Sequence, residues 1–203
     1  MTTEIPSKEL IIRLYIDEQK SSRQIAEALR CSENKINYWL KRYSIKKRSI
    51  SDATYIRSNP TGDPFIFDPP KTKDDYRLFG MGLGLYWGEG NKKNTNTVRL
   101  GNTDPKLIMK FLEFMERFYR ISPERIKFGL QIFSDMEPKA ALKFWCKTLN
   151  VTADRFGKVV VTPSRGKGTY REKTRHGVLT VYIFNKKLRD LICGEIEKMQ
   201  KMP

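Results

Sequence analysis

The stretch LFGMGLGLYWGEG, residues 78–90, decides how the second half of this chain folds. Five of its thirteen residues are glycine, and two aspartates just before it suit a helix N-terminus. In the helix that this predicts, Gly80, Gly84 and Gly88 lie four residues apart on one face. Each glycine costs about 1 kcal/mol of helix stability relative to alanine, so three on one stripe indicate close approach of another backbone. Side chains on the other sides of the helix are expected to pack on a sheet: Leu83, Leu85, Tyr86 and Trp87. The helix is expected to end at Gly90, whose conformational freedom lets the chain turn.

Other glycine-rich motifs fit this stretch less well. A dinucleotide-binding loop needs a strand before its glycines, and the preceding DDYR is not a strand pattern. No Gly-Lys-Ser/Thr follows, which excludes a P-loop. Glu89 ends the apolar run at the helix C-terminus, where the helix dipole disfavours a negative charge. This unfavourable placement favours a functional role over that of a solvated surface carboxylate.

The composition points to a polyanionic partner. The chain has 203 residues and a formal net charge of +16, and an excess of this size indicates nucleic acid or an anionic membrane surface. No apolar run reaches the roughly 18 residues that span a bilayer, and MTTEIPSKEL lacks the layout of a signal peptide. We therefore expect a cytoplasmic protein without membrane partners; a prokaryotic cytosol or nucleoid is what the family resemblance described below implies.

The few cysteines and the single histidine argue against disulfide bonds and against several kinds of catalytic and metal site. Cys31, Cys146 and Cys193 are scattered without paired spacing, which indicates reduced thiols. His176 is the single histidine, which argues against His-based zinc sites, Ser-His-Asp chemistry and His-dependent nucleases.

Residues 1–48 predict an all-α domain of three short helices. Ser7, Ser21 or Ser22, and Ser32 are candidate N-caps. The residues expected to face inward are Leu10, Ile11, Leu14, Tyr15, Ile25, Ala26, Leu29, Ile36, Trp39 and Leu40. The spacing resembles a helix-turn-helix, whose last helix enters the DNA major groove.

The outer face of the third helix is the candidate DNA-reading surface. Its residues are Asn34, Lys35, Asn37, Tyr38, Lys41 and Arg42. Asparagine can read adenine, and lysine can read guanine or hold phosphate. The following IKKRS adds charge for phosphate. The alternative is a plain three-helix packing unit with a solvated polar face.

Residues 49–73 predict a linker or strap between two domains. Four prolines interrupt the segment, so helix is not expected. FIFDPP is expected to pack as one short extended piece.

Residues 74–203 predict an α+β domain with an antiparallel sheet. NKKNTNTVRLGN has the pattern of a short hairpin, and Asp104-Pro105 begins a helix. RIKFGLQIF alternates as a half-exposed strand, and KVVVTPS and GVLTVYIF are further strands. EPKAALKFWCKTL and KKLRDLICGEIEKM are helical.

GLGLYWGEG, Gly82–Gly90, resembles the nine-residue signature of LAGLIDADG homing endonucleases. Gly84, Leu85 and Gly90 coincide with it, and Glu89 stands at the position of the catalytic acid. The resemblance covers about residues 74–199 and implies an αββαββα unit, here with an extra helix around Trp145. It also implies that two such helices pack through small residues, so Gly80, Gly84 and Gly88 become a dimer interface.

The resemblance further implies a catalytic and metal-binding role for Glu89. Mg²⁺ or another divalent cation would be held by the Glu89 carboxylate and the Gly88 carbonyl. One signature and no internal repeat imply a homodimer, with one Glu89 from each chain on a nearly two-fold symmetric double-stranded DNA.

Further DNA contacts are expected from the sheet face and a basic loop. The candidates are Lys92, Lys93, Arg99, Lys127, Gln131, Lys158, Arg165, Lys167 and Arg171. Phe111, Phe144 and Trp145 are expected in the core rather than as base-stacking platforms.

Three readings of the function follow. The first is a Mg²⁺-dependent, site-specific DNA endonuclease that acts as a homodimer. The alternative is a non-cleaving, DNA-binding transcription regulator that retains the same fold, as in similar sporulation regulators. Trp87 at the position of the signature's first aspartate and the extra helix favour the second, whereas a carboxylate at Glu89 favours the first. A recombinase or transposon-linked accessory protein is a third reading.

Overall fold

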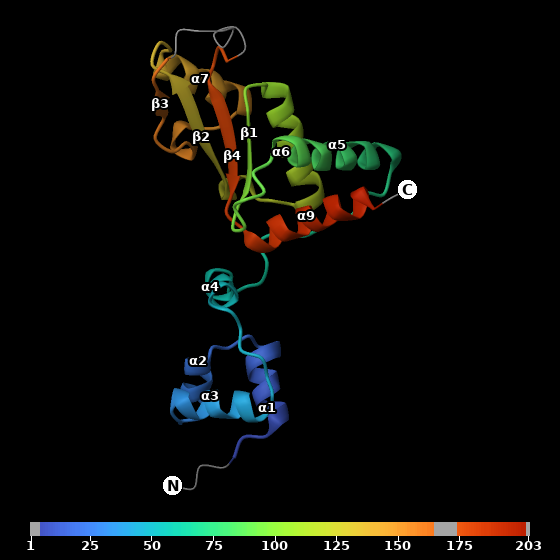
Figure 1. Ribbon diagram of the computed structural model, residues 1–203, viewed down its shortest axis with the longest axis vertical. Coiled ribbons are helices and arrows are strands. Elements are labelled where there is room, and N and C mark those ends of the chain that lie inside the picture. Colours follow the sequence, from blue (N-terminus) through green and yellow to red (C-terminus); the bar gives the residue numbers. More distant parts are fainter. Residues whose placement is uncertain (1–4, 165–173, 202–203) are drawn as a thin grey trace. The chain divides into compact units, whose positions relative to one another are not determined.

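The computed structural model describes residues 5–164 and 174–201. The chain divides into two compact units, Met1–Asp63 and Pro64–Pro203, and their boundary lies within the segment 49–73. The secondary structure is mixed α+β, as the sequence predicts (Figure 1). Among the described residues, no helix combines the length and the apolar character needed to cross a membrane.

The N-terminal unit is built from short helices that begin at serine caps. The helices are α1 Lys8–Ile12, which continues as a π-helical turn Arg13–Asp17, α2 Ser22–Ala28, α3 Glu33–Arg42 and α4 Ile50–Ser58. The hydroxyls of Ser7, Ser21 and Ser32 each accept a hydrogen bond from a backbone N–H of the first turn. These three predicted caps are therefore confirmed.

One small core holds this unit together. Its side chains are at most 7% exposed, and they are Ile11, Leu14, Tyr15, Ile25, Ala26, Ile36, Trp39 and Leu40. All eight were expected to face inward. Leu10 and Leu29, also expected inside, are partly buried and pack against this core.

Arg48 fastens the chain that follows α3 back onto the first helix. Its guanidinium donates hydrogen bonds to the carbonyls of Gln19 (2.9 Å), Lys20 (2.7 Å) and Tyr15. The same group lies 4.1 Å from the centre of the Tyr15 ring. Arg48 belongs to the segment IKKRS, whose charges were expected to contact phosphate. Its donors instead satisfy carbonyls that the end of the helical segment leaves without partners.

Helix α4 lies in the segment where the prolines predicted none. Ser49 caps it by accepting a hydrogen bond from the Asp52 N–H at 3.1 Å. The first proline, Pro60, comes after the helix has ended, so residues 50–58 contain no residue that breaks a helix. The expectation was wrong because it extended the effect of the prolines to residues that precede them.

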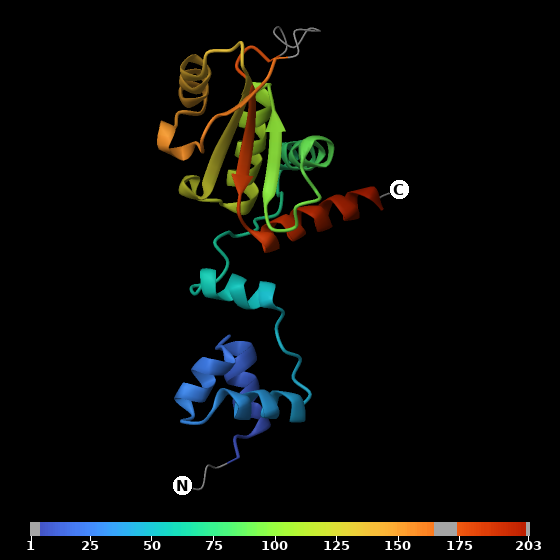
Figure 2. The same cartoon turned by 60° about the vertical axis from the view of Figure 1, so that its left-hand side comes forward.

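The C-terminal unit has a four-stranded sheet and four longer helices among its described residues. The elements are α5 Lys73–Glu89, β1 Val98–Asn102, α6 Pro105–Tyr119, β2 Ile126–Phe133, α7 Pro138–Leu149, β3 Val160–Thr162, β4 Val178–Ile183 and α9 Lys186–Gln200, with single 3-10 turns at Pro123–Arg125 and Ala153–Arg155. Helices α5, α6 and α9 contact β1, and α7 contacts β2 (Figure 2).

The sheet is mixed rather than antiparallel, which corrects the sequence expectation. Its strand order is β1-β4-β2-β3. Strand β4 is antiparallel to both of its neighbours, whereas β2 and β3 are parallel. Helix α7 lies between β2 and β3 in the chain and carries it back to the end where β2 began, which is how parallel neighbours are connected. The extra helix was recognised in the sequence, but its effect on strand direction was not.

The predicted hairpin after α5 has one regular strand only. β1 pairs along β4, with Leu100 opposite Val181. The chain leaving α5 contributes a single bridge, Gly90 to Leu100, and one hydrogen bond from the Asn91 N–H to the Arg99 carbonyl at 2.8 Å. The polar residues between Asn91 and Asn96 turn back on their own backbone instead of forming a ladder.

Alternating strand residues build the core of the C-terminal unit. Strand β2 buries Ile126, Phe128, Leu130 and Ile132, which confirms the predicted alternation. These side chains meet buried aromatics of α6, including Phe111, Phe114 and Phe118. Gly82 of α5 lies directly against Phe114, and a Cβ atom at Gly82 would come within 2.1 Å of the ring. Glycine is therefore required at this helix crossing.

Residues 64–72, which we call the strap, run extended to α5 and are tied to α6. The Ile66 and Asp68 N–H groups donate to the carbonyls of Tyr119 and Phe118 at 3.1 and 2.8 Å. FIFDPP therefore packs as an extended piece, as expected. The Phe67 ring stacks on Tyr119 with centroids 5.3 Å apart.

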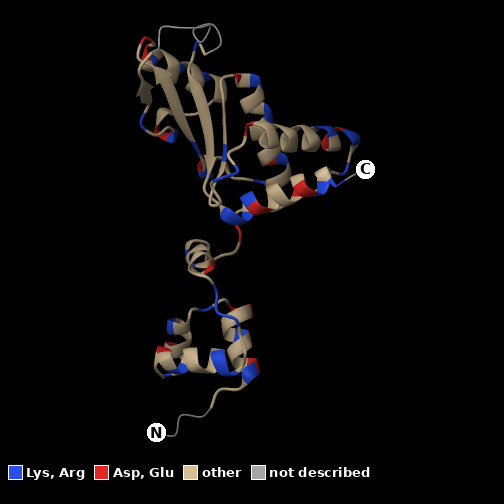
Figure 3. Cartoon of the chain, viewed as in Figure 1, with Lys and Arg blue, Asp and Glu red and all other residues tan. Residues whose placement is uncertain are grey.

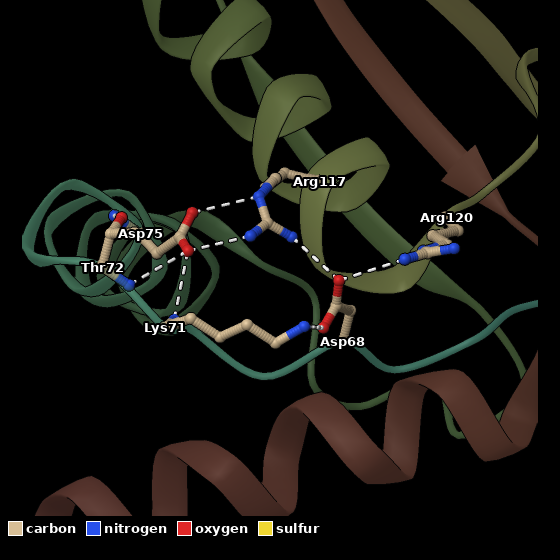
Figure 4. Close-up of polar contacts among 6 residues, drawn as sticks. All are labelled: Asp68, Lys71, Thr72, Asp75, Arg117 and Arg120. Carbon is tan, nitrogen blue, oxygen red and sulfur yellow. Dashed lines mark hydrogen bonds and ion pairs between the residues drawn. The ribbon is translucent and has the colours of Figure 1, made fainter.

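An ion-pair network joins the strap and the start of α5 to α6 (Figure 4). Arg117 donates two hydrogen bonds to Asp75, at 3.0 and 2.8 Å, and one to Asp68 at 3.2 Å. Asp68 also pairs with Lys71 at 2.7 Å and Arg120 at 3.1 Å. The Lys71 ammonium, followed by the Arg120 guanidinium, holds the pKa of Asp68 at about 2. Hydrogen bonds from the Lys71 backbone and from Arg117 also lower the pKa of Asp75.

We expect Gly82→Ala to lower the free energy of unfolding of the protein by about 1–3 kcal/mol, because the added methyl group overpacks the contact with Phe114. Gly194→Ala in α9 is the matched control, since its Cβ would meet nothing within 4 Å. The control should raise stability by up to about 1 kcal/mol through helix propensity. Urea denaturation followed by circular dichroism measures both. Equal effects of the two substitutions would contradict the packing assignment.

The network also predicts a loss of stability in acid. The pKa of Asp68 is about 2 in the folded protein and about 3.9 when unfolded. Its stabilising contribution is therefore present above about pH 4 and disappears as the pH falls towards about 2. Asp68→Asn should flatten the pH dependence of the unfolding free energy in this window, measured by urea denaturation.

Asp74→Asn is the control for this experiment, because the Asp74 side chain is 89% exposed and that of Asp68 is 13% exposed. An Asp74→Asn protein should keep the wild-type pH dependence. Parallel curves for wild type and Asp68→Asn would show that the network contributes nothing.

Candidate nucleic-acid interface

The glycine stripe of α5 faces away from its own unit. A Cβ atom at Gly80, Gly84 or Gly88 would meet no other atom within 4 Å. We call this face the glycine ridge. Large apolar side chains of α5 that remain exposed beside it are Tyr76, Met81 and Trp87. An apolar helix face with small residues, left uncovered by its own chain, suits contact with a second helix.

Of the four large side chains of α5 expected to pack on the sheet, all but Trp87 lie in or at the edge of the core. Leu83 and Tyr86 are buried in the core and Leu85 packs at its edge. Trp87 was also expected to pack inward, but it is 49% exposed. At 100° per residue its side chain points to the same side of the helix as Tyr76, which explains the difference.

Gly90 ends α5 for a steric reason. It was expected to turn the chain through glycine's conformational freedom, but its φ of −73° and ψ of 142° are accessible to any residue. A Cβ atom at Gly90 would instead lie 2.3 Å from the Tyr86 carbonyl oxygen and 2.5 Å from the Tyr86 ring. The absence of a side chain lets the chain turn tightly beneath that ring and reach β1.

The loop after α5 is held by contacts from both of its sides. The Lys92 ammonium donates to the Trp87 carbonyl and, at 3.5 Å, to the Tyr86 carbonyl. The Lys92 carbonyl accepts a 2.6 Å hydrogen bond from Arg189 of α9. Burial raises the pKa of Tyr86 to about 12, so its hydroxyl keeps its proton and lies 3.5 Å from the Asn91 carbonyl. Lys92 thus caps α5 and compensates the negative end of its dipole.

Glu89 lies at this helix end with an exposed carboxylate. Within the described residues no hydrogen bond or ion pair engages it, and no group of three His, Cys, Asp or Glu side chains there could hold a metal ion. A single chain therefore offers one carboxylate, with the Gly88 carbonyl as a further oxygen in the last turn. Hard divalent cations prefer such oxygen ligands but need more than this pair.

Helix α3 presents the six residues expected to read DNA. Asn34, Tyr38, Lys41 and Arg42 are exposed, while Lys35 and Asn37 are half-buried. Arg42 donates a 3.1 Å hydrogen bond to the Tyr38 hydroxyl, and its guanidinium lies 5.6 Å from the Trp39 ring centre. Lysine and arginine positions recur along the ribbon of this helix (Figure 3). The surface combines amide, hydroxyl and cationic groups on one helix, which is the chemistry that duplex recognition uses.

The open face of the sheet brings together residues from three strands. Arg99, Tyr182 and Lys127 lie side by side across β1, β4 and β2. The next outward row is Gly101, Thr180 and Gly129. The Tyr182 ring lies over Gly129, and the Thr180 hydroxyl lies beside Gly101, so the two glycines leave room for side chains of β4. Gln131 is exposed on the same face, beside Thr162 at 3.5 Å.

The remaining predicted contact residues have separate positions. Lys93 is exposed in the loop after α5, and Lys158 is exposed just before β3. Lys92 is engaged with the end of α5, as described above. Arg165, Lys167 and Arg171 lie outside the described residues.

Sequence reasoning missed an aromatic pair on the open face. The rings of Tyr182 and Phe184 are stacked, with an interplanar angle of 7° and centroids 6.1 Å apart. Arg99 places its guanidinium 5.0 Å from the Tyr182 ring centre. The signal was present in GVLTVYIF, where the residues that alternate with the apolar inward ones are Thr180, Tyr182 and Phe184.

Of the three aromatic residues expected in the core, two are fully buried and one is half-buried. Trp145 and Phe111 are fully buried, and half-buried Phe144 stacks on His176 with centroids 3.5 Å apart. Burial lowers the pKa of His176.

Cys31, Cys146 and Cys193 are free thiols, as predicted.

The chain matches no known family, no curated protein and no solved structure.

Proposed function

We propose that this chain is a sequence-specific DNA-binding protein that acts as a homodimer and cuts DNA as a divalent-metal-dependent endonuclease of the LAGLIDADG type. The observation that carries the proposal is helix α5. One side of this helix is buried, its glycine ridge is uncovered, and it ends at the exposed carboxylate of Glu89.

The order of elements supports this fold assignment. Helix α5 is followed by the Gly90 bridge, β1, α6, β2, β4 and α9, which parallels an αββαββα unit whose first strand has shrunk to that bridge. Strand β3, inserted together with α7 between β2 and β4, does not belong to this pattern. Helix α7 is the additional element. The open face of the sheet carries Arg99 and Lys127, where such a unit would receive DNA.

The glycine ridge explains why two chains would be needed. Small residues at four-residue spacing let two helices approach at backbone distance, and two-fold packing places the same residue of each chain at equivalent positions. Two copies of α5 in contact would bring two Glu89 carboxylates and two Gly88 carbonyls towards the dimer axis. Together they form an oxygen-rich donor set that one chain lacks.

The donor set suits Mg²⁺, which takes carboxylate and carbonyl oxygens and retains several waters. A bound divalent cation would supply Lewis-acid activation of the phosphodiester and of a water nucleophile. The chain's own groups hold the oxygens in place: Lys92 and Arg189 fix the loop behind Glu89, and the buried Tyr86 fixes the last turn of α5.

Duplex binding would draw on two surfaces of the chain. Helix α3 supplies the groove-reading residues of a helix-turn-helix, with Asn34, Lys41 and Arg42 exposed. Lys127 and Gln131 on the sheet would add further contacts. The net charge of +16 supports a strongly salt-dependent interaction with phosphates.

A specific observation favours a second candidate, a DNA-binding regulator that does not cut. The Lys92 ammonium already occupies the carbonyls of Tyr86 and Trp87 beside Glu89. A fixed positive charge there opposes binding of a divalent cation at the same helix end. Incubation of the protein with a randomised DNA library and Mg²⁺, followed by sequencing of bound and of cut molecules, separates the two. Enriched sequences with breaks support the nuclease, and enrichment without breaks supports the regulator.

Glu89→Gln should abolish detectable cleavage of the selected DNA, because the amide cannot replace the carboxylate as a metal ligand. DNA affinity should stay within about twofold, since no phosphate contact is removed. Cleavage is measured on gels with Mg²⁺ and binding by anisotropy without it. Glu113→Gln on α6, another exposed carboxylate, serves as the control and should cut normally. Undiminished cleavage by Glu89→Gln would refute the assignment of the acid.

Gly84→Leu should convert the dimer into a monomer, because a bulky side chain on the ridge keeps the two backbones apart. The folded monomer should tolerate the change, since no atom of its own chain lies within 4 Å of that Cβ. Gly194→Leu, at an equally open position of α9, is the control and should remain dimeric. Analytical ultracentrifugation measures the mass of each variant. A monomeric wild type at micromolar concentration would argue against the paired-helix site.

A further inference from the structure

A groove of about 390 Å³ lies on the open face of the sheet, beside the start of β2. We call it the aromatic groove. The residues that line it and carry the argument are Lys127, Gly129, Arg155, Lys158, Tyr182 and Phe184. It is lined by residues of the C-terminal unit alone, and none of them belongs to the helix end at Glu89.

One wall of the groove is a flat aromatic surface. The Tyr182 and Phe184 rings are nearly parallel, at 7°, and Phe184 is 70% exposed. Apolar surface that is exposed and contiguous over neighbouring side chains marks binding sites in soluble proteins. Arg99 lies over Tyr182 and fixes that ring by a cation–π contact. Of the two rings, the one that stays open to solvent is therefore that of Phe184.

Glycine at position 129 is what allows this wall to exist. A Cβ atom there would lie 2.8 Å from Cε2 of Tyr182 and 3.1 Å from its hydroxyl. The side chain of any other residue at position 129 would displace the Tyr182 ring of β4 from its place over β2. Gly129 also lines the groove itself, next to the Tyr182 ring that lies over it.

The other charged residues that line the groove are mostly cationic. Lys127 and Lys158 are exposed. The Arg155 guanidinium donates to the carbonyls of Pro123 and Ile126, which fixes it in place while it keeps its charge. Asp154 is the single acid among the lining residues. Its hydrogen bond with Thr152, and then the charges of Arg155 and Lys127, lower its pKa. Three cations against one carboxylate leave a site that favours an anion.

We propose that the aromatic groove binds one unpaired deoxynucleotide, with its base stacked on the exposed ring of Phe184 and its phosphate beside Lys127 and Lys158. The proposal rests on the DNA binding proposed above and specifies the substrate further, as a duplex that contains an unpaired base. Both faces of a base inside a regular duplex are covered by its neighbours, so only an unpaired base can offer a face to the wall. The cations account for the phosphate, which a purely apolar ligand would not require.

The test uses the full chain and three DNA probes of one sequence, without Mg²⁺. The probes are a perfect duplex, the same duplex with a single bulged 2-aminopurine, and the single strand that carries the 2-aminopurine. The wild type should bind the bulged duplex more tightly than the perfect one and should quench the 2-aminopurine fluorescence. Phe184→Leu keeps an apolar side chain but loses the flat ring. It should weaken binding of the bulged duplex by about 5-fold or more and remove the quenching.

Phe184→Trp is the matched control, because it restores a flat ring and should retain both the preference and the quenching. Binding of the perfect duplex should change by less than about twofold in either variant. Equal wild-type affinity for both duplexes without quenching, or an unchanged Phe184→Leu protein, would overturn the groove assignment and leave the proposed function standing. Quenching with the single strand but no binding of the perfect duplex would support the groove and refute duplex recognition. Failure to bind any probe would refute both.

Discussion

The contact between the Gly82 backbone and the Phe114 ring fixes the C-terminal unit, because it brings helices α5 and α6 closer than any side chain at position 82 would permit. This contact orients α5 about its own axis. Once Gly82, Leu83 and Tyr86 face inward, helical geometry turns the other glycines of the helix outward. The same run of residues thus produces a tightly packed side and a bare one. The bare side is a consequence of the packing on the opposite side of the helix.

Local physical rules were enough to predict much of this fold. Serine caps located the helix starts at Ser7, Ser21 and Ser32, and alternation identified β2 and its buried residues. The stripe of Gly80, Gly84 and Gly88 also followed from spacing alone. These features depend on neighbours within a few residues, which a sequence displays directly.

Features that depend on residues far apart in the chain could not be predicted in the same way. The direction of β3 depends on how helix α7 returns the chain to the sheet. From the sequence, the charges of Arg48 and Lys92 were expected to be available for phosphate. In the folded chain both side chains donate hydrogen bonds to backbone carbonyls at helix ends or just after them, and such partners can be identified only from the tertiary structure. Tyr182 and Phe184 alternate visibly in the sequence, but their use as a wall requires a glycine on the neighbouring strand.

The two proposed binding regions of the C-terminal unit rely on different uses of glycine. On α5 the missing side chains leave room for a second helix, whereas on the sheet Gly129 leaves room for a ring of the same chain. In both places a loss of local stability creates a surface, since glycine weakens helices and strands alike. Stability comes instead from the aromatic core of α6 and from ionic contacts of the strap.

The strap also determines where the C-terminal unit can be separated as an autonomous fragment. The start of helix α5 suggests residue 73 as a natural boundary, but a fragment begun there would lack Phe67, which covers Tyr119, and Asp68, which neutralises the end of α6. An expression fragment of this unit must therefore begin at Pro64. Its first nine residues are part of the folded body, although they form no helix or strand of their own.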